Sequence, residues 1–152
     1  MPNISNPRKE FNFTINFEGL NPWLAQKVTT PEVSLDATAH GDANYEVKTA
    51  GMRKVGDMNI KKLCPSDATD LWVSAWIERC QSAYTQSGEL PSEYKRDLMI
   101  EELGPDNITV IGRWELVGVW PKRRGDRSLN RLSSNNILED IDFSVDDCRQ
   151  TL

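Results

Sequence analysis

The residue types that carry most enzyme chemistry are sparse in this chain and lie far apart. His40 is the only histidine, so relays and metal sites built from several histidines are excluded. The sequence also lacks CxxC spacing, a Gly-rich phosphate loop and a GxSxG motif. The paired carboxylates Glu101-Glu102 and Asp146-Asp147 fall on or beside expected strands, where neighbours point to opposite faces and make poor acid–base partners. We therefore expect no catalytic centre, no bound metal and no cofactor.

The three cysteines, Cys64, Cys80 and Cys148, are odd in number and widely spaced. The expected state is three reduced, partly buried thiols. The alternative is that the near-terminal Cys148 pairs with another chain after export into an oxidising environment.

Charge is a more informative signal than catalytic residue types. The net charge of −5 over 152 residues argues against a general nucleic-acid coat. One segment nevertheless contains five cations and a single acid, Asp126. It predicts either a solvated loop or a surface that binds phosphates or an acidic partner. Its cations are Lys122, Arg123, Arg124, Arg127 and Arg131.

The sign reverses in the segment that follows. Ile137, Ile141, Phe143 and Val145 alternate with polar residues, which predicts a strand with one apolar and one acidic face. The acidic face is either simply solvated or lines a wall that repels a DNA backbone. Its candidate lining residues are Asp140, Asp142 and Asp146.

A long strand at residues 108–120 is expected to position both charged segments. Its even positions form a strongly apolar face, and Gly112 and Gly118 on that face suggest a bend or close packing. Pro121 has no N–H to donate, so strand pairing is expected to end there.

Other segments supply the elements that cover this strand. Alternation or β-branched residues predict strands within 11–17, 23–36, 55–63 and 94–103, and a turn at 104–107 makes the last of these a hairpin with the long strand. Residues 1–10 are expected to form an arm. A helix is expected at 66–86, capped by Ser66 or Asp67. Its apolar stripe is Leu71, Trp72, Ala75, Trp76, Ile77, Cys80, Ala83 and Tyr84.

Residues 37–54 show no sustained periodicity apart from a possible short strand at 45–48. A compact domain rarely has so long a connection without a use for it. Two interpretations stay open: a loop held by a partner subunit, or a mobile hairpin tip. The candidate contact residues are His40, Asp42, Tyr45, Lys48, Met52 and Arg53.

These elements predict one mainly β domain over residues 1–152. The expected architecture is an antiparallel β-sandwich or partial barrel with one flanking α-helix. A single helix cannot cover all the strand edges, so we expect neighbouring subunits to close them, as in a multi-subunit β-barrel ring. No apolar run approaches the ~18 residues of a membrane span, and no membrane anchor is expected.

The sequence resembles the tail tube proteins of contractile-tailed bacteriophages, which share a fold with the tubes of type VI secretion and R-type bacteriocins. The resemblance spans about residues 8–148 and rests on the order and spacing of six segments. They are FNFTINFEGL, KVTTPEVSLD, GMRKVGDMNIKKL, SDATDLWVSAWIERC, RWELVGVWPKR and NNILEDIDFSV.

The resemblance implies a structural protein whose six-fold rings stack into a tube. The expected partners are other copies of itself, a sheath, baseplate tube initiators, a tape measure and a tail terminator. DNA would pass through the lumen without specific binding, with residues 37–54 reaching another subunit or ring and the basic segment lying outside or between rings. The particle would be a virion tail assembled in the bacterial cytoplasm.

Two alternatives remain open at this point. One is a secretion-system or bacteriocin tube of the same fold. The other is a small nucleic-acid-binding module that uses residues 122–131 with Trp114 or Trp120 as a stacking platform.

Overall fold

The computed structural model describes residues 12–16, 25–42, 44–64 and 71–152. The predicted arm and the predicted helix caps Ser66 and Asp67 lie outside these ranges. The strands are β1 (Phe13–Asn16), β2 (Ala25–Thr29), β3 (Val33–Asp42), β4 (Tyr45–Val55), β5 (Met58–Leu63), β6 (Arg96–Leu103), β7 (Val110–Arg124), β8 (Leu138–Ser144) and β9 (Asp147–Gln150). The helices are α1 (Trp72–Cys80) and α2 (Pro91–Tyr94).

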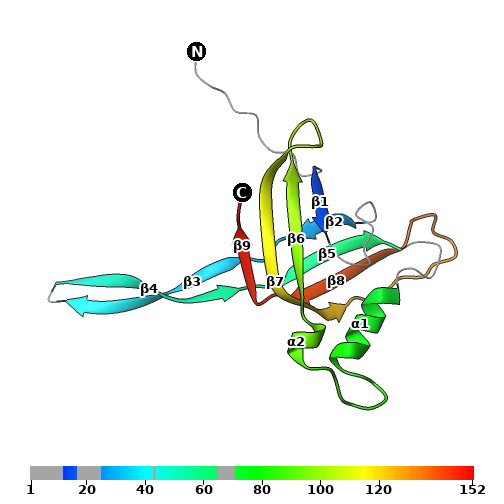
Figure 1. The fold of residues 1–152 in the computed structure, drawn as a ribbon, viewed down its shortest axis with the longest axis horizontal. Helices are drawn as coiled ribbons and strands as arrows, with labels where there is room; N and C mark the ends of the chain where they lie inside the picture. The colour runs from blue at the N-terminus through cyan, green and yellow to red at the C-terminus, as the bar shows by residue number, and fades with distance from the viewer. Residues whose placement is uncertain (1–11, 17–24, 43, 65–70) are drawn as a thin grey trace.

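The main sheet is antiparallel and organised around β7, as the sequence predicted. The strand order is β1-β6-β7-β8-β5-β2, and β9 also pairs with β7 (Figure 1). The first part of β7 pairs with β6 and β9, while its last residues pair with β8. One strand therefore belongs to both halves of a folded-over sheet. The fold is mainly β with the flanking helix α1, and the short α2 is a second helix that the sequence did not predict. The hairpin predicted at 104–107 is confirmed as the connection between β6 and β7.

Gly118 marks the point where β7 changes from one half of the sheet to the other. Its φ is +67°, and a Cβ built there would lie 2.1 Å from Asp146 Oδ2. Leu116 and Val119 are both fully buried although they are three residues apart, because the register shifts between them. The predicted bend at Gly118 is thus confirmed.

The expectation that pairing ends at Pro121 is wrong. Pro121 lies opposite Phe143, and β7 continues to Arg124 with a second irregularity between Pro121 and Arg123. A proline is tolerated at such a bulge because the ladder is already interrupted there.

Both halves of the sheet and α1 enclose one core. Val73 and Trp76 of α1 are buried, and the Trp76 ring lies 5.9 Å from the Phe143 ring. Trp76 Nε1 also donates a hydrogen bond to the Tyr94 carbonyl oxygen at 2.7 Å, which ties α1 to α2. The remaining core side chains come from both halves of the sheet: Ile15, Met58, Ile60, Leu98, Ile100, Leu116, Val119, Ile141, Phe143, Val145 and Cys148.

The helix is shorter than predicted, because α1 ends at Cys80 rather than at residue 86. Gln81 is extended, and Gly88 lies so close to the Cys80 carbonyl that a Cβ would not fit. The chain therefore turns back directly after Cys80. Tyr84, predicted to pack, is 95% exposed, and Val73 was missing from the predicted stripe.

Residues 33–55 form a two-stranded antiparallel hairpin, β3–β4, instead of an irregular connection. The hairpin extends away from the main sheet (Figure 1). Residues 34–41 and 44–54 are all exposed, which explains the missing periodicity: neither face is buried, so no alternation is required. None of the described helices is long and apolar enough to cross a membrane.

Candidate functional site

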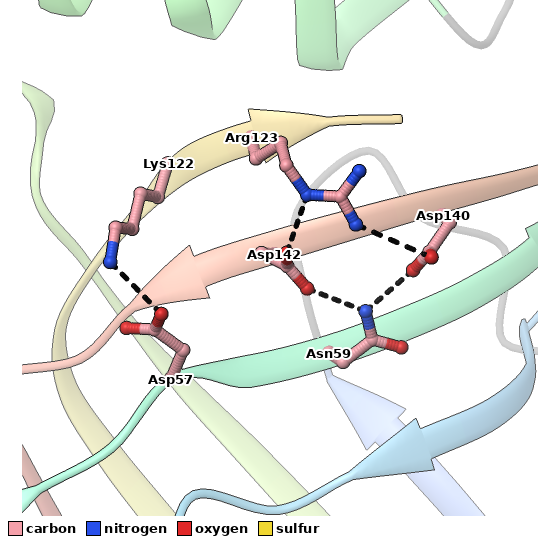
Figure 2. A network of polar contacts seen from close by, with 6 residues as sticks. All are labelled: Asp57, Asn59, Lys122, Arg123, Asp140 and Asp142. Carbon is pink, nitrogen blue, oxygen red and sulfur yellow. Dashed lines mark hydrogen bonds and ion pairs between the residues drawn. The ribbon is translucent and has the colours of Figure 1, made fainter. Parts of the chain in front are cut away.

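Two of the three predicted acidic residues lie together in a polar network on β5, β7 and β8. Asn59 Nδ2 donates hydrogen bonds to Asp140 Oδ1 at 2.5 Å and to Asp142 Oδ1 at 2.6 Å. Arg123 lies on the other side of the two carboxylates (Figure 2), with Nε 2.7 Å from Asp142 Oδ2 and Nη2 3.4 Å from Asp140 Oδ2. The network is thus a closed ring of one cation, one amide and two carboxylates.

Strand register brings these residues together. Asn59 and Arg123 both lie opposite Asp142, on the two strands that flank β8. Donation from Asn59 and Arg123 holds the pKa of Asp142 below its ordinary value, and the Asp142 carboxylate raises the pKa of Arg123. Arg123 therefore offsets one of the two negative charges, and the network keeps one net negative charge.

The predicted basic segment is divided among several carboxylates. Lys122 Nζ lies 3.0 Å from Asp57 Oδ2, beside the network (Figure 2). Arg124 donates to Ser74 Oγ, and Arg127 Nη2 lies 3.4 Å from Glu139 Oε2.

Arg131, the fifth predicted cation, lies in the exposed loop after β7. Phosphate binding needs a dense, uncompensated positive surface. Because four of the five cations have partners in the same chain, the arrangement does not favour the nucleic-acid-binding alternative.

Asp146 lies apart from the other two acids. It follows the end of β8, next to Gly118, and its Oδ2 is 2.8 Å from Lys95 Nζ. The structure therefore brings together Asp140 and Asp142 and leaves Asp146 at a different place.

The sequence reasoning missed a buried ion pair. Lys62 Nζ lies 2.8 Å from Glu139 Oε2, and both side chains are only 1% exposed. Lys62 has the same strand parity as Met58 and Ile60, and Glu139 has the same parity as Ile141. A charged residue at an apolar position on each of two neighbouring strands was the signal that could have revealed the pair.

The predicted contact residues of segment 37–54 lie along β3 and β4. Tyr45 and Met52 are 65% and 72% exposed, and His40 and Lys48 are exposed as well. Asp42 lies opposite Tyr45 at the tip.

Arg53 differs from these residues because it binds its own chain. Its Nη2 lies 3.1 Å from Asp147 Oδ1 and donates to the Cys148 carbonyl at 2.5 Å. Arg53 thus anchors the base of the hairpin to β9.

All three cysteines are in the thiol form. Cys148 is 1% exposed, and burial is the main cause that raises its pKa and that of Cys80. In this conformation the Cys148 sulfur is covered by its own chain. The part of the chain that the structure describes contains no group of three or more His, Cys, Asp or Glu residues arranged to hold a metal ion.

Solved structures with the same fold come from contractile machines. One is the sheath/tube terminator of an extracellular contractile injection system (16% identity, TM-score 0.79, covering 99% of this chain and 100% of that chain). Another comes from the sheath–tube complex of the same kind of system (17% identity, TM-score 0.77, 97% and 93% covered). Hcp1 from Flavobacterium johnsoniae is similar over 91% of this chain and 93% of its own, at 12% identity and a TM-score of 0.51.

These similarities define the fold as that of tube proteins. The family model described as T4-like virus tail tube protein gp19 matches residues 9–149, so the chain belongs to this tail tube family. A search of curated proteins finds no match.

Proposed function

We propose that this chain is the subunit of the inner tube of a contractile phage tail, with six copies closing into a ring and the rings stacking. The observation that carries the proposal is the β3–β4 hairpin, whose residues 34–41 and 44–54 are exposed on both faces. An isolated two-stranded hairpin is at best marginally stable in water. A hairpin of this length therefore implies a partner.

The ends of the main sheet support the same proposal. In the described chain, β1 pairs only with β6 and β2 pairs only with β5, so both are edge strands. Open edges favour pairing with another chain, and rotation of identical subunits about one axis closes a ring without leaving any edge free.

Within such a ring, Asp140 and Asp142 are proposed to line the lumen wall, and Asp146, which lies apart from them, is a separate prediction for the same wall. Arg123 offsets one of the two carboxylates and Asn59 is uncharged, so this part of the wall would present DNA with a weakly negative surface. DNA transit without specific binding fits such a surface. The role is structural, with no catalytic step.

The remaining partners follow from the tail function. They are the sheath, the baseplate tube initiators, the tape measure and the terminator, in a virion tail assembled in the host cytoplasm. The match to a tail tube family over residues 9–149 favours a phage tail, and the tube of an injection or secretion system is the second candidate. An intersubunit disulfide at Cys148 requires that its sulfur be uncovered, and non-reducing electrophoresis of assembled particles tests it: intersubunit bands support the disulfide, and monomer bands alone dismiss it.

The first experiment is negative-stain electron microscopy of the purified chain over a range of concentrations. Six-fold rings or tubes with a central channel are expected. A uniform monomer that binds DNA at low salt and releases it at high salt would instead identify a nucleic-acid-binding module.

A further inference from the structure

We propose that only one face of the β3–β4 hairpin, the face carrying Tyr45, Val47 and Met52, is buried against a second copy of the chain. This inference rests on the proposed tube function and adds which side chains make the contact.

Strand register assigns the side chains of the hairpin to its two faces. Residues directly opposite each other in an antiparallel pair share a face. The pairs Thr38–Thr49 and His40–Val47 therefore lie on one face together with Tyr45, which we call the Tyr45 face. The pairs Ala37–Ala50, Ala39–Lys48 and Gly41–Glu46 lie on the other, which we call the Ala39 face.

A bulge places Met52 on the Tyr45 face. The register shifts between Leu35 and Ala37, so that Gly51 and Met52 together lie opposite Asp36. A Cβ built on Gly51 would contact Asp36 and the Thr38 hydroxyl, which confirms that the bulge lies on the Thr38 side. Without this extra residue, strand alternation would put Met52 on the face opposite Tyr45 and Val47.

The two faces differ strongly in exposed apolar surface. Tyr45, Val47 and Met52 are 65%, 43% and 72% exposed, and they are the large apolar side chains between residues 36 and 52. Leu35, 58% exposed, lies on the Ala39 face nearer the base of the hairpin. Beyond Leu35, the Ala39 face carries alanine and glycine beside Glu46 and Lys48. Tyrosine and methionine are enriched at protein interfaces, whereas lysine and glutamate are depleted.

The second copy is favoured as the occupant because the same chain carries exposed apolar side chains at its other end. Leu129 and Leu132 are 78% and 96% exposed in the connection between β7 and β8. This connection and the hairpin lie at opposite ends of the molecule (Figure 1). Copies arranged head to tail can therefore cover both surfaces, and such a contact repeats around a ring.

The test compares Val47→Glu with Ala39→Glu. Each variant adds one negative charge at an exposed position in the middle of the hairpin, on opposite faces. Neither position belongs to the core, so the thermal unfolding of the free chain is expected to stay unchanged. Sedimentation and electron microscopy then give the lowest concentration at which rings or tubes form.

We expect Val47→Glu to raise that concentration at least about tenfold, because an unpaired charge would be buried at the interface. Ala39→Glu is expected to change it by less than about twofold, because its carboxylate stays in water opposite Lys48. Equal losses in both variants, or normal assembly of Val47→Glu, would overturn the one-face assignment and leave the tube function intact. A wild-type chain that never self-associates, with or without a tube initiator, would overturn both.

A photo-crosslinking residue at position 45 provides a readout independent of the charge change. When the crosslinker is the only change from the wild-type sequence, assembled particles are expected to give crosslinked dimers from position 45 and not from position 39. The reverse pattern would contradict the proposal.

Discussion

The pair of Lys62 and Glu139 shows how a single interaction can decide stability. Both groups are removed from water, and their attraction across 2.8 Å offsets the cost of burial. Arg127 lies 3.4 Å from the same Glu139 oxygen and reaches it from a less buried position. The carboxylate therefore compensates more than one cation, and its loss affects the whole cluster.

Glu139→Gln is expected to lower the free energy of unfolding by ~3–5 kcal/mol, because it leaves the Lys62 ammonium buried without a countercharge. Urea unfolding of the free chain measures this change. The matched control is Lys62→Met combined with Glu139→Leu, which removes both charges and is expected to be close to neutral. If Glu139→Gln were as stable as the double variant, the Lys62 ammonium would not be buried without a countercharge, and the ion pair would not be buried.

Asp106 gives the β6–β7 turn a defined pH dependence. Its carboxylate accepts hydrogen bonds from the Thr109 hydroxyl and from the backbone N–H groups of Thr109 and Ile108. These bonds lower the pKa of Asp106 from 3.8 to about 2. Because the folded-state pKa is the lower one, the stabilisation is present above pH 3.8 and is lost as the pH falls toward 2.

Asp106→Ala is therefore expected to lose less stability than the wild type over that pH interval. Urea midpoints measured at several pH values test this expectation, since other carboxylates contribute equally to both proteins. Parallel pH profiles would show that the turn does not depend on the ionised carboxylate.

At the scale of the elements, Gly118 is the position on which the path of β7 depends. Its φ of +67° is unfavourable for a residue with a side chain, and Asp146 occupies the space that a Cβ would need. Gly118→Ala is expected to destabilise the chain by ~1–3 kcal/mol. Gly41→Ala is the control, because a Cβ at Gly41 meets nothing within 4 Å, and it is expected to stay within ~0.5 kcal/mol. Thermal and urea unfolding distinguish the two variants.

The sequence predicted those elements whose two faces differ in burial. The alternation of apolar and polar residues up to Val145 identified β8, and the apolar face of residues 108–120 identified β7. In both strands, burial of one face enforces a period of two. The same logic found only the start of β3 and a possible short strand at 45–48 within β4, because both faces of this hairpin are exposed.

Long-range contacts were harder to predict than the elements. The end of α1 at Cys80 depends on the turn that brings Gly88, eight residues further on, against the Cys80 carbonyl, and helical periodicity does not reveal this turn. The pairing of Asp142 with Arg123 depends on a register that local sequence does not define, so an acidic and a basic segment that were treated separately meet in one network.

At the scale of the whole molecule, the hairpin is separable from the core. The backbone N–H of Gly56 donates to the Glu32 carbonyl at 2.8 Å, so the two ends of the hairpin meet at its base. Replacing residues 36–52 by an Asn-Gly turn between the paired residues Leu35 and Arg53 keeps the contacts of Arg53 with β9 and is expected to leave a folded monomer.

This deletion variant is expected to unfold cooperatively near the wild-type temperature and to form no rings or tubes. Calorimetry and electron microscopy measure the two properties separately. Tube formation by the deletion variant would show that the contacts between copies lie elsewhere, and loss of folding would show that the hairpin stabilises the core.

The continuity of β7 has a mechanical consequence. A force that tends to slide one half of the sheet over the other is carried through the covalent backbone around Gly118, where β7 leaves β6 and β9 and joins β8. Such sliding breaks hydrogen bonds between strands one after another, whereas the continuous polypeptide through Gly118 stays intact. A subunit built on such a strand is suited to a rigid rod that is pushed from one end.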